Sequence, residues 1–297
     1  MKICSTENMR IAERELIVSG TPARTLMQQA SAGIAEAIMQ FFPVPGLCVA
    51  YLGKGNNAGD AITVLNILQR HGWDTGFRAA YPRSEWRELP LRQFAEISPP
   101  LLEYQEAPLP VTGRPMVLLD GLLGIGTSGL LNKEIAGLCA EMNYLRDRCG
   151  AVRTVAVDIP TGIDADTGMP QEHAVEADFT MCIGAVKQGL LDDDATLHVG
   201  RLVCIELPGL HVQALPATEI ITSSRLTKFL SARPYTDYKN KRGHLGVIAG
   251  SEGMLGAARL CCEAALRAGA GLVTLHVHRT AYPCLLYTSP SPRDTER

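Results

Sequence analysis

Short, continuously apolar runs alternate with helix-like patterns along most of the first 210 residues. An apolar run without polar alternation is typical of a parallel strand that helices cover on both faces. The runs predict strands at 47–52, 116–119, 154–157, 179–183 and 202–205, with a weaker candidate at 73–80. Because strands joined by helices form right-handed crossovers, this alternation predicts a three-layer α/β/α domain with a mostly parallel sheet.

Helical periodicity separates the predicted strands. One amphipathic stripe, at spacings of i, i+3, i+4 and i+7, is formed by Ala61, Val64, Leu65 and Leu68. Further helices are predicted at 25–41 and 133–149.

The overall composition excludes several classes of protein. Hydrophobic residues make up 46% and charged residues 20%, and the net charge of −3 gives no reason to expect nucleic acid or an acidic membrane surface as a partner. No apolar run approaches the ~20 residues that cross a bilayer, and the start lacks a secretory signal. The nine cysteines show no metal-binding or redox spacing. We therefore expect a cytoplasmic enzyme with neither a nucleic-acid nor a membrane partner.

The first candidate binding motif, GKGNNAGD at 53–60, follows the strand at 47–52. In open α/β sheets, ligands bind beyond the carboxyl ends of the strands, and the N–H groups of a following helix can hold a diphosphate. Part of the motif fits G-x-G-x-x-G/A, but no acid ends the next strand to bind a ribose, and no G-K-S/T follows. A plain turn is the alternative for the paired asparagines.

Two further motifs place an acid at the end of a predicted strand. Asp120 precedes the glycine-rich segment 121–130, and Asp158 precedes Pro160, which stops the chain from continuing as helix or sheet. A carboxylate at such a position is partly desolvated, which suits proton transfer, although Asp158 could also be an N-cap or turn acid. Two acids and an asparagine amide also supply hard oxygen ligands, which fit Mg²⁺ and K⁺ equally.

These motifs resemble the signature blocks of the NAD(P)H-hydrate epimerase family. The blocks are GKGNNAGD at 53–60, DGLLGIGTSGL at 120–130 and VAVDIPTGIDADTG at 155–168, in that order. Further agreement begins at Met9-Arg10, includes 25–30 and 179–191, and extends the resemblance over about the first 210 residues. The resemblance implies a Rossmann-like domain at 1–212 that interconverts the R and S forms of hydrated NADH or NADPH.

The family resemblance also implies roles for individual residues. It assigns the hydrated dinucleotide to Asn56, Asn57, Ala58, Gly59, Asp60, Gly124, Ile125, Gly126, Thr127, Ser128, Gly129, Leu130 and Asp158. It assigns one K⁺ per subunit to Asn57, Asp120 and Thr161, and it makes Asp158 the catalytic candidate.

The chain departs from the family pattern at three of these positions. Ala58 and Ala61 replace glycines, and Thr161 stands where serine is usual but keeps the hydroxyl. A methyl group at Ala58 would crowd the backbone cradle if that residue needs a positive φ.

The implied reaction suits the residues. The hydrate carries a hydroxyl on the nicotinamide ring carbon next to the ring nitrogen, whose lone pair can expel it to leave a flat iminium. Water can then re-enter from either face. We expect Asp158 to protonate the leaving hydroxyl and, as a carboxylate, to deprotonate the returning water.

A second pattern begins after a proline-rich linker at 213–237. Residues 238–283 read as strand, helix and strand, and they resemble the start of the ribokinase-like NAD(P)H-hydrate dehydratase, whose cofactor is ADP or ATP. This segment is too short to bury its own core, so we expect an inactive dehydratase half with Leu260, Leu266 and Leu272 exposed. Residues 284–294 back-translate into codons that resemble a sequencing adapter, and we expect residues 284–297 to be an artefact.

Two other functions stay open at this point. A Rossmann-type oxidoreductase is disfavoured by the missing ribose acid and by the lack of a catalytic His or Tyr constellation. A non-catalytic nucleotide-binding module is disfavoured because Asn57, Asp120 and Asp158 occur together. A homo-oligomer is compatible with the sequence.

Overall fold

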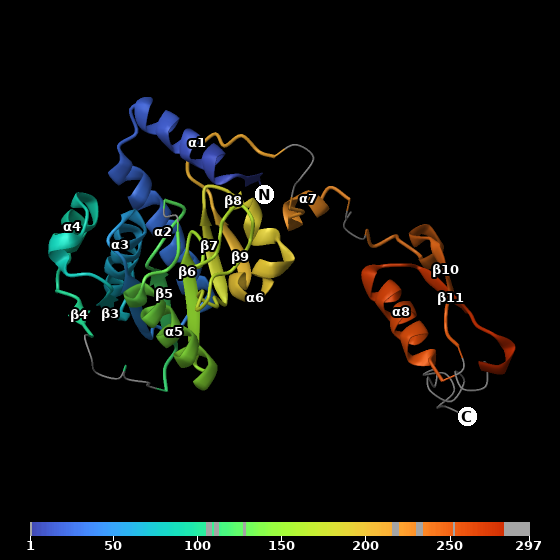
Figure 1. The fold of residues 1–297 in the computed structure, drawn as a ribbon. Coiled ribbons are helices and arrows are strands. Elements are labelled where there is room, and N and C mark those ends of the chain that lie inside the picture. Colours follow the sequence, from blue (N-terminus) through green and yellow to red (C-terminus); the bar gives the residue numbers. More distant parts are fainter. Residues whose placement is uncertain are drawn as a thin grey trace. The chain divides into compact units, whose positions relative to one another are not determined.

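The computed structural model describes residues 2–104, 109, 113–126, 129–215, 220–229, 234–251 and 253–281. The chain divides into two compact units, residues 1–222 and 223–297 (Figure 1). Thr127, Ser128 and the tail at 284–297, all subjects of sequence predictions, lie outside the described residues. Among those described, no helix combines the length and apolar character that crossing a membrane requires.

A seven-stranded parallel sheet organises the first unit, in the order β4-β3-β2-β5-β6-β7-β9. Its strands are β2 Leu47–Leu52, β3 Asp74–Ala79, β4 Leu102–Glu103, β5 Met116–Gly121, β6 Val152–Val157, β7 Phe179–Ile183 and β9 Arg201–Ile205. The five predicted strands and the weaker candidate at 73–80 are all present. The predicted fold class is confirmed.

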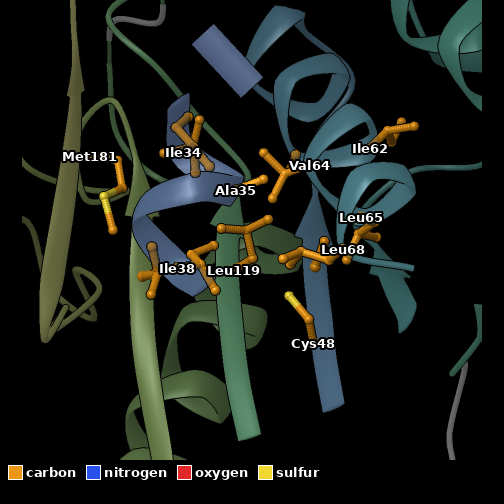
Figure 2. Close-up of a cluster of buried hydrophobic side chains, with 14 of the residues drawn as sticks. Ile34, Ala35, Ile38, Cys48, Ile62, Val64, Leu65, Leu68, Leu119 and Met181 are labelled. Atoms are coloured by element: carbon orange, nitrogen blue, oxygen red, sulfur yellow. The ribbon is translucent and has the colours of Figure 1, made fainter. Parts of the chain in front are cut away.

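Helices cover both faces of this sheet (Figure 1). Helices α2 Ala23–Phe41 and α3 Asn56–Arg70 lie on one face and α5 Lys133–Arg148 on the other, while α1 Thr6–Val18, α4 Glu88–Ala95 and the short α6 Thr196–Val199 complete the unit. On one face, Ile34 and Ile38 of α2 meet Leu65 and Leu68 of α3 over the strands (Figure 2). On the other face, α5 packs its buried side chains against β2 and β5. Each such aliphatic side chain contributes about 1.5–3 kcal/mol through burial.

The residues before α2 form structure that the sequence patterns did not predict. Strand β1, Ile3–Cys4, pairs in parallel with β8, Val186–Lys187. Helix α1 follows, and the Ser5 hydroxyl accepts a hydrogen bond from the Asn8 N–H as its N-cap. Thr6 donates two hydrogen bonds to the Asp166 carboxylate, which fixes the start of α1 to the loop after β6.

Helix α3 begins five residues earlier than its apolar stripe indicates. It starts at Asn56, with Gly55 in extended conformation as the N-cap, so residues 56–60 form its first turn and not a loop. Ala58 is helical and completely buried, and it is not among the residues with positive φ. The condition for crowding at Ala58, a positive φ, is therefore not met, because the backbone there is one that any L-residue adopts.

The second unit contains the predicted strand, helix and strand. They are β10 His244–Ile248, α8 Leu255–Ala268 and β11 Leu272–His276, and β10 pairs in parallel with β11. A short helix, α7 Ser223–Leu226, precedes them. Leu260 and Leu266 are exposed as expected, whereas Leu272 is partly buried.

Candidate functional site

The strand order places a topological switch point between β2 and β5. The chain leaves β2 for β3 on one side and later enters β5 on the other, so the connections after β2 and β5 diverge above their carboxyl ends. Ligands bind at such a switch point in open α/β sheets. The two connections approach closely, since a Cβ on Gly53 would lie 2.0 Å from the Leu122 carbonyl oxygen. Only glycine allows that approach.

The start of α3 follows β2 at this switch point. The Ala58 and Gly59 N–H groups bond to the Gly55 carbonyl, which leaves the N–H groups of Asn56 and Asn57 for an anion, and Asn57, Ala58, Gly59 and Asp60 are all buried. A Cβ on Gly121 at the end of β5 would lie 2.5 Å from the Ala61 methyl group. Ala61 therefore fills space against Gly121, which explains how the chain accommodates an alanine there.

Hydrogen bonds around Leu123 connect the three predicted cation ligands, Asn57, Asp120 and Thr161. The Thr161 hydroxyl donates to Asp120 Oδ1 over 2.7 Å, and the Thr161 N–H donates to Asp120 Oδ2 over 2.7 Å. The Leu123 N–H donates to the Thr161 hydroxyl at 3.1 Å, and the Leu123 carbonyl accepts from the Asn57 amide nitrogen at 3.1 Å. The structure thus brings together residues that are up to 104 positions apart.

Asp120 is completely buried and forms no ion pair with any described residue. Burial raises the pKa of its carboxyl to about 6, although hydrogen bonds from Thr161 and Leu122 oppose that rise. A buried carboxylate without a cationic partner costs free energy. This cluster is therefore a place where a bound cation would stabilise the fold.

The glycine-rich segment after β5 borders a cavity of about 370 Å³. Gly124, Ile125, Gly129 and Leu130 line it together with Thr161, while Asn57, Asp120 and Asp158 do not. Arg10 of α1 also lines the cavity and donates a hydrogen bond to the Ile125 carbonyl. Four of the five described residues of this predicted substrate segment therefore line the cavity. The fifth, Gly126, has open space around it.

Asp158 follows β6 and lies beside a lysine whose role the sequence reasoning missed. The Lys187 ammonium group is completely buried and forms an ion pair with Asp158 Oδ1, which also accepts from the Ile183 N–H at 3.0 Å. Lys187 donates to the Ile183 carbonyl as well, at 2.9 Å. Burial alone would lower the pKa of Lys187, but the attraction of Asp158 reverses the effect, so the pKa is raised.

The backbone at Asp158 is unusual. Its φ is +68°, a left-handed conformation that only Asp, Asn and glycine adopt with any frequency. This conformation turns the chain at the end of β6, and the Asp158 N–H still bonds to the Met181 carbonyl of β7 at 3.0 Å. Such strain is typical of functional positions.

The charge of Asp158 acts on two acidic side chains, Asp60 from α3 and Glu13 from α1. Burial raises the pKa of Asp60 well above its ordinary value, and repulsion by Asp158 and Glu13 adds to the rise. Burial also raises the pKa of Glu13, again with repulsion by Asp158, while Lys187 and Arg10 act in the opposite direction. The resemblance suggested Asp60 as a substrate contact, whereas Glu13 escaped notice because α1 was not predicted.

The chain has recognisable relatives among known proteins. The family described as YjeF-related protein N-terminus matches residues 23–189. Proteins from Coxiella burnetii, Synechocystis sp. and Escherichia coli K12, each named bifunctional NAD(P)H-hydrate repair enzyme Nnr, are 30%, 27% and 30% identical to it. These matches cover 96%, 93% and 90% of this chain, but 57%, 53% and 52% of the relatives. The chain therefore spans about half of their length.

A solved structure shares the fold. The crystal structure of yeast ynu0 matches 69% of this chain and 87% of its own chain with a TM-score of 0.56. The two sequences are 19% identical, so the likeness supports the α/β architecture alone.

Proposed function

The chain belongs to the NAD(P)H-hydrate epimerase family, and from this membership we propose that its first unit interconverts the R and S epimers of hydrated NADH and NADPH. Its substrate is then a small molecule with a diphosphate and a hydroxylated nicotinamide ring. The observation that carries the proposal is the gathering of Asn57, Asp120, Asp158 and Thr161 around the carboxyl ends of β2, β5 and β6.

We propose that Asp158 accepts a proton in this reaction. Lys187 and the Ile183 N–H both contact the same carboxylate oxygen of Asp158, Oδ1. A carboxylate held in this way can take a proton from water that adds to the iminium form of the ring. The N–H groups at the start of α3 would hold the diphosphate, with Asn56 to Asp60 as the adjoining side chains.

The residues around Asp120 fit a monovalent cation. The Thr161 hydroxyl donates a hydrogen bond to Asp120, and the Asn57 amide nitrogen donates one to the Leu123 carbonyl. The hydroxyl oxygen of Thr161 and the amide oxygen of Asn57 therefore keep lone pairs for a ligand. We propose that K⁺ binds to Asn57, Asp120 and Thr161, since all three offer hard oxygen atoms. A bound K⁺ would offset negative charge of the diphosphate and of Asp120. Among the described residues, His, Cys, Asp and Glu form no group of three or more that could hold a metal ion.

An isotope experiment tests the proposed function. The purified chain is incubated with one hydrate epimer in H₂¹⁸O. The epimers are then separated by chromatography, and the ¹⁸O content of each is measured by mass spectrometry. We expect the second epimer to form far faster than in the buffer blank and to carry ¹⁸O, because the ring hydroxyl leaves and water replaces it. Epimerisation no faster than the blank would defeat the proposal. Conversion without ¹⁸O would defeat the mechanism.

For the second unit we propose a relationship to the NAD(P)H-hydrate dehydratase domain. Its support is the parallel β10-α8-β11 arrangement within residues 238–283, together with relatives whose matches cover more than nine-tenths of this chain. ADP or ATP is a ligand of that domain, not of the first unit. Incubation with the S-hydrate and either nucleotide, with absorbance at 340 nm followed, measures whether this chain restores NADH.

A further inference from the structure

One cationic side chain borders the cavity of about 370 Å³ beside the glycine-rich segment, and the proposed function gives it no role. Among the described residues that line this cavity, Arg10 of α1 alone carries a positive charge. Its Nη2 atom donates to the carbonyl oxygen of Ile125, which lines the same cavity. The guanidinium group itself, and not only its aliphatic stem, therefore lies at the cavity wall.

Contacts one helical turn earlier set the position of Arg10. The Thr6 N–H donates to Asp166 Oδ1 over 2.8 Å, and the Thr6 hydroxyl donates to Asp166 Oδ2. Thr6 and Asp166 line the cavity as well. Residues i and i+4 of a helix share one face, so Arg10 lies on the same side of α1 as Thr6. Helix α1 is therefore held with this side toward the cavity.

Most donors of the Arg10 guanidinium group are unused. Arginine presents its N–H groups in a planar fork, and among the described residues only the Ile125 carbonyl accepts a hydrogen bond from them. Arg10 also forms no ion pair with any described acid, and Glu13, three residues further along α1, attracts it at longer range. A cation with free donors at a cavity wall can bind an anionic group of a ligand.

The two acids that line the cavity accept hydrogen bonds from the chain itself. Both oxygens of Asp166 accept from Thr6. Asp164 Oδ1 accepts from the N–H groups of Asp166 and Thr167, at 3.0 and 2.8 Å. These carboxylates therefore stabilise the loop after β6 and the start of α1, and neither of them neutralises Arg10.

The glycine-rich segment connects Arg10 with the proposed diphosphate site. A Cβ on Gly124 would lie 3.4 Å from the side chain of Asn57, in the first turn of α3. The next residue, Ile125, accepts from Arg10, and Gly126 has open space around it. Because consecutive Cα atoms are only about 3.8 Å apart, the start of α3 and the guanidinium group contact neighbouring residues of one segment. A single dinucleotide can reach both.

We propose that Arg10 is a substrate-binding residue that holds a phosphate group of the hydrated dinucleotide at this cavity. The inference rests on the proposed epimerase function, which supplies the ligand. A guanidinium fork matches phosphate oxygens with two parallel hydrogen bonds. Both substrates carry a diphosphate, and the NADPH form carries a further phosphate on its adenosine ribose. Either group has the chemistry that Arg10 recognises.

A kinetic comparison of the two hydrates tests the proposal. Arg10→Gln removes the charge but keeps an amide that can donate to Ile125. We expect KM to rise roughly 10- to 100-fold, with kcat little changed, because substrate and transition state lose the same contact. A rise for both hydrates assigns Arg10 to the diphosphate, and a rise for the NADPH hydrate alone assigns it to the ribose phosphate. An unchanged KM for both hydrates, or a fall in kcat alone, would overturn the proposal and leave Arg10 as a support of the glycine-rich segment.

Arg14→Gln is the matched control. Arg14 is exposed on the same helix and does not line the cavity, so this variant loses the same charge without the proposed contact. Its KM values should equal those of the wild-type protein, and an equal rise in both variants would contradict the proposal. A thermal melt checks folding. Arg10→Lys, which keeps the charge but lacks the fork, should raise the same KM by a smaller factor, and it decides the matter if Arg10→Gln does not fold.

Calorimetric titration separates this inference from the epimerase function. NADH, NADPH and inorganic pyrophosphate are each titrated into the wild-type protein and into Arg10→Gln, under conditions without turnover. We expect weaker binding to Arg10→Gln of the probes that carry the recognised phosphate. That result in a protein that fails the ¹⁸O assay would support the phosphate site and remove the epimerase function. Equal affinities of the two proteins for every probe would overturn the phosphate site, whatever the ¹⁸O assay shows.

Discussion

Lys187 and Asp158 form an ion pair at the end of β6, inside a part of the protein where the lysine side chain has no contact with solvent. The lysine comes from β8, which is paired with the N-terminal strand β1 through Cys4 and Lys187. The same lysine donates to the Ile183 carbonyl, and Ile183 donates to the same Asp158 oxygen. The pair therefore joins the loop after β6, the end of β7 and the N-terminal segment.

Removal of the lysine should cost both stability and activity. In Lys187→Met the Asp158 carboxylate keeps its burial but loses its counter-charge, and a buried charge left alone costs roughly 3–5 kcal/mol. Chemical denaturation measures the loss in the free energy of unfolding. Lys133→Met, at an exposed position of α5, is the control and should unfold like the wild-type protein. The double variant Lys187→Met/Asp158→Asn should recover part of the loss, and failure to do so would contradict the pairing.

The sequence predicted the sheet well because its strands carry strong local signals. Runs such as 47–52 and 116–119 are apolar throughout, and the helices between them have clear stripes. The N-terminal elements lacked such signals. Strand β1 has two residues and exists because it pairs with β8, which is 183 positions away. A tertiary pairing of this kind leaves no periodicity in the chain, so the segment that supplies Glu13 was not foreseen.

The acid–base role of Asp158 predicts a specific outcome for Asp158→Asn. Asparagine tolerates the left-handed φ of +68° and can still accept from Ile183 and Lys187, but it cannot exchange a proton at neutral pH. We expect epimerisation to be lost while the fold and nucleotide binding are kept. Asp193→Asn, which makes the same chemical change at an exposed position outside the cavity lining, serves as control. Turnover near the wild-type level in Asp158→Asn would show that another group accepts the proton.

The alanine that replaces a family glycine in α3 gives a stability prediction. Because Ala58 is helical and buried, Ala58→Gly should lower the free energy of unfolding by about 1 kcal/mol through helix propensity. No gain in kcat or in nucleotide affinity should accompany it. Thermal unfolding and steady-state kinetics measure the two effects. A several-fold rise in kcat would mean that the methyl group does obstruct the substrate.

The sequence located the strand-end residues of the site but not their relationships. Asp120, Asp158 and the 53–60 motif are recognisable because each follows an apolar run, and parallel strands bring their carboxyl ends to one edge of a sheet. Which residue pairs with which depends on loops and on register. The hydrogen bond between Thr161 and Asp120 and the ion pair between Lys187 and Asp158 span 41 and 29 positions. The family resemblance grouped Thr161 with Asp120, whereas no pattern in the chain indicates the ion pair between Lys187 and Asp158.

The buried charge of Asp120 leads to a prediction about K⁺. The carboxylate has no cationic partner among the described residues, and the Thr161 and Asn57 oxygens lie in the same cluster. A cation that binds there stabilises the folded state by RT ln(1 + [K⁺]/Kd). We therefore expect KCl to raise the melting temperature above that in choline chloride at equal ionic strength.

Thr161→Ser should keep this K⁺-dependent rise because it retains the hydroxyl, whereas the nearly isosteric Thr161→Val should lose most of it, whatever its own stability. Crystals soaked with Rb⁺ should show anomalous density beside Asp120. A melting temperature indifferent to K⁺, together with no density there, would remove the cation from this site.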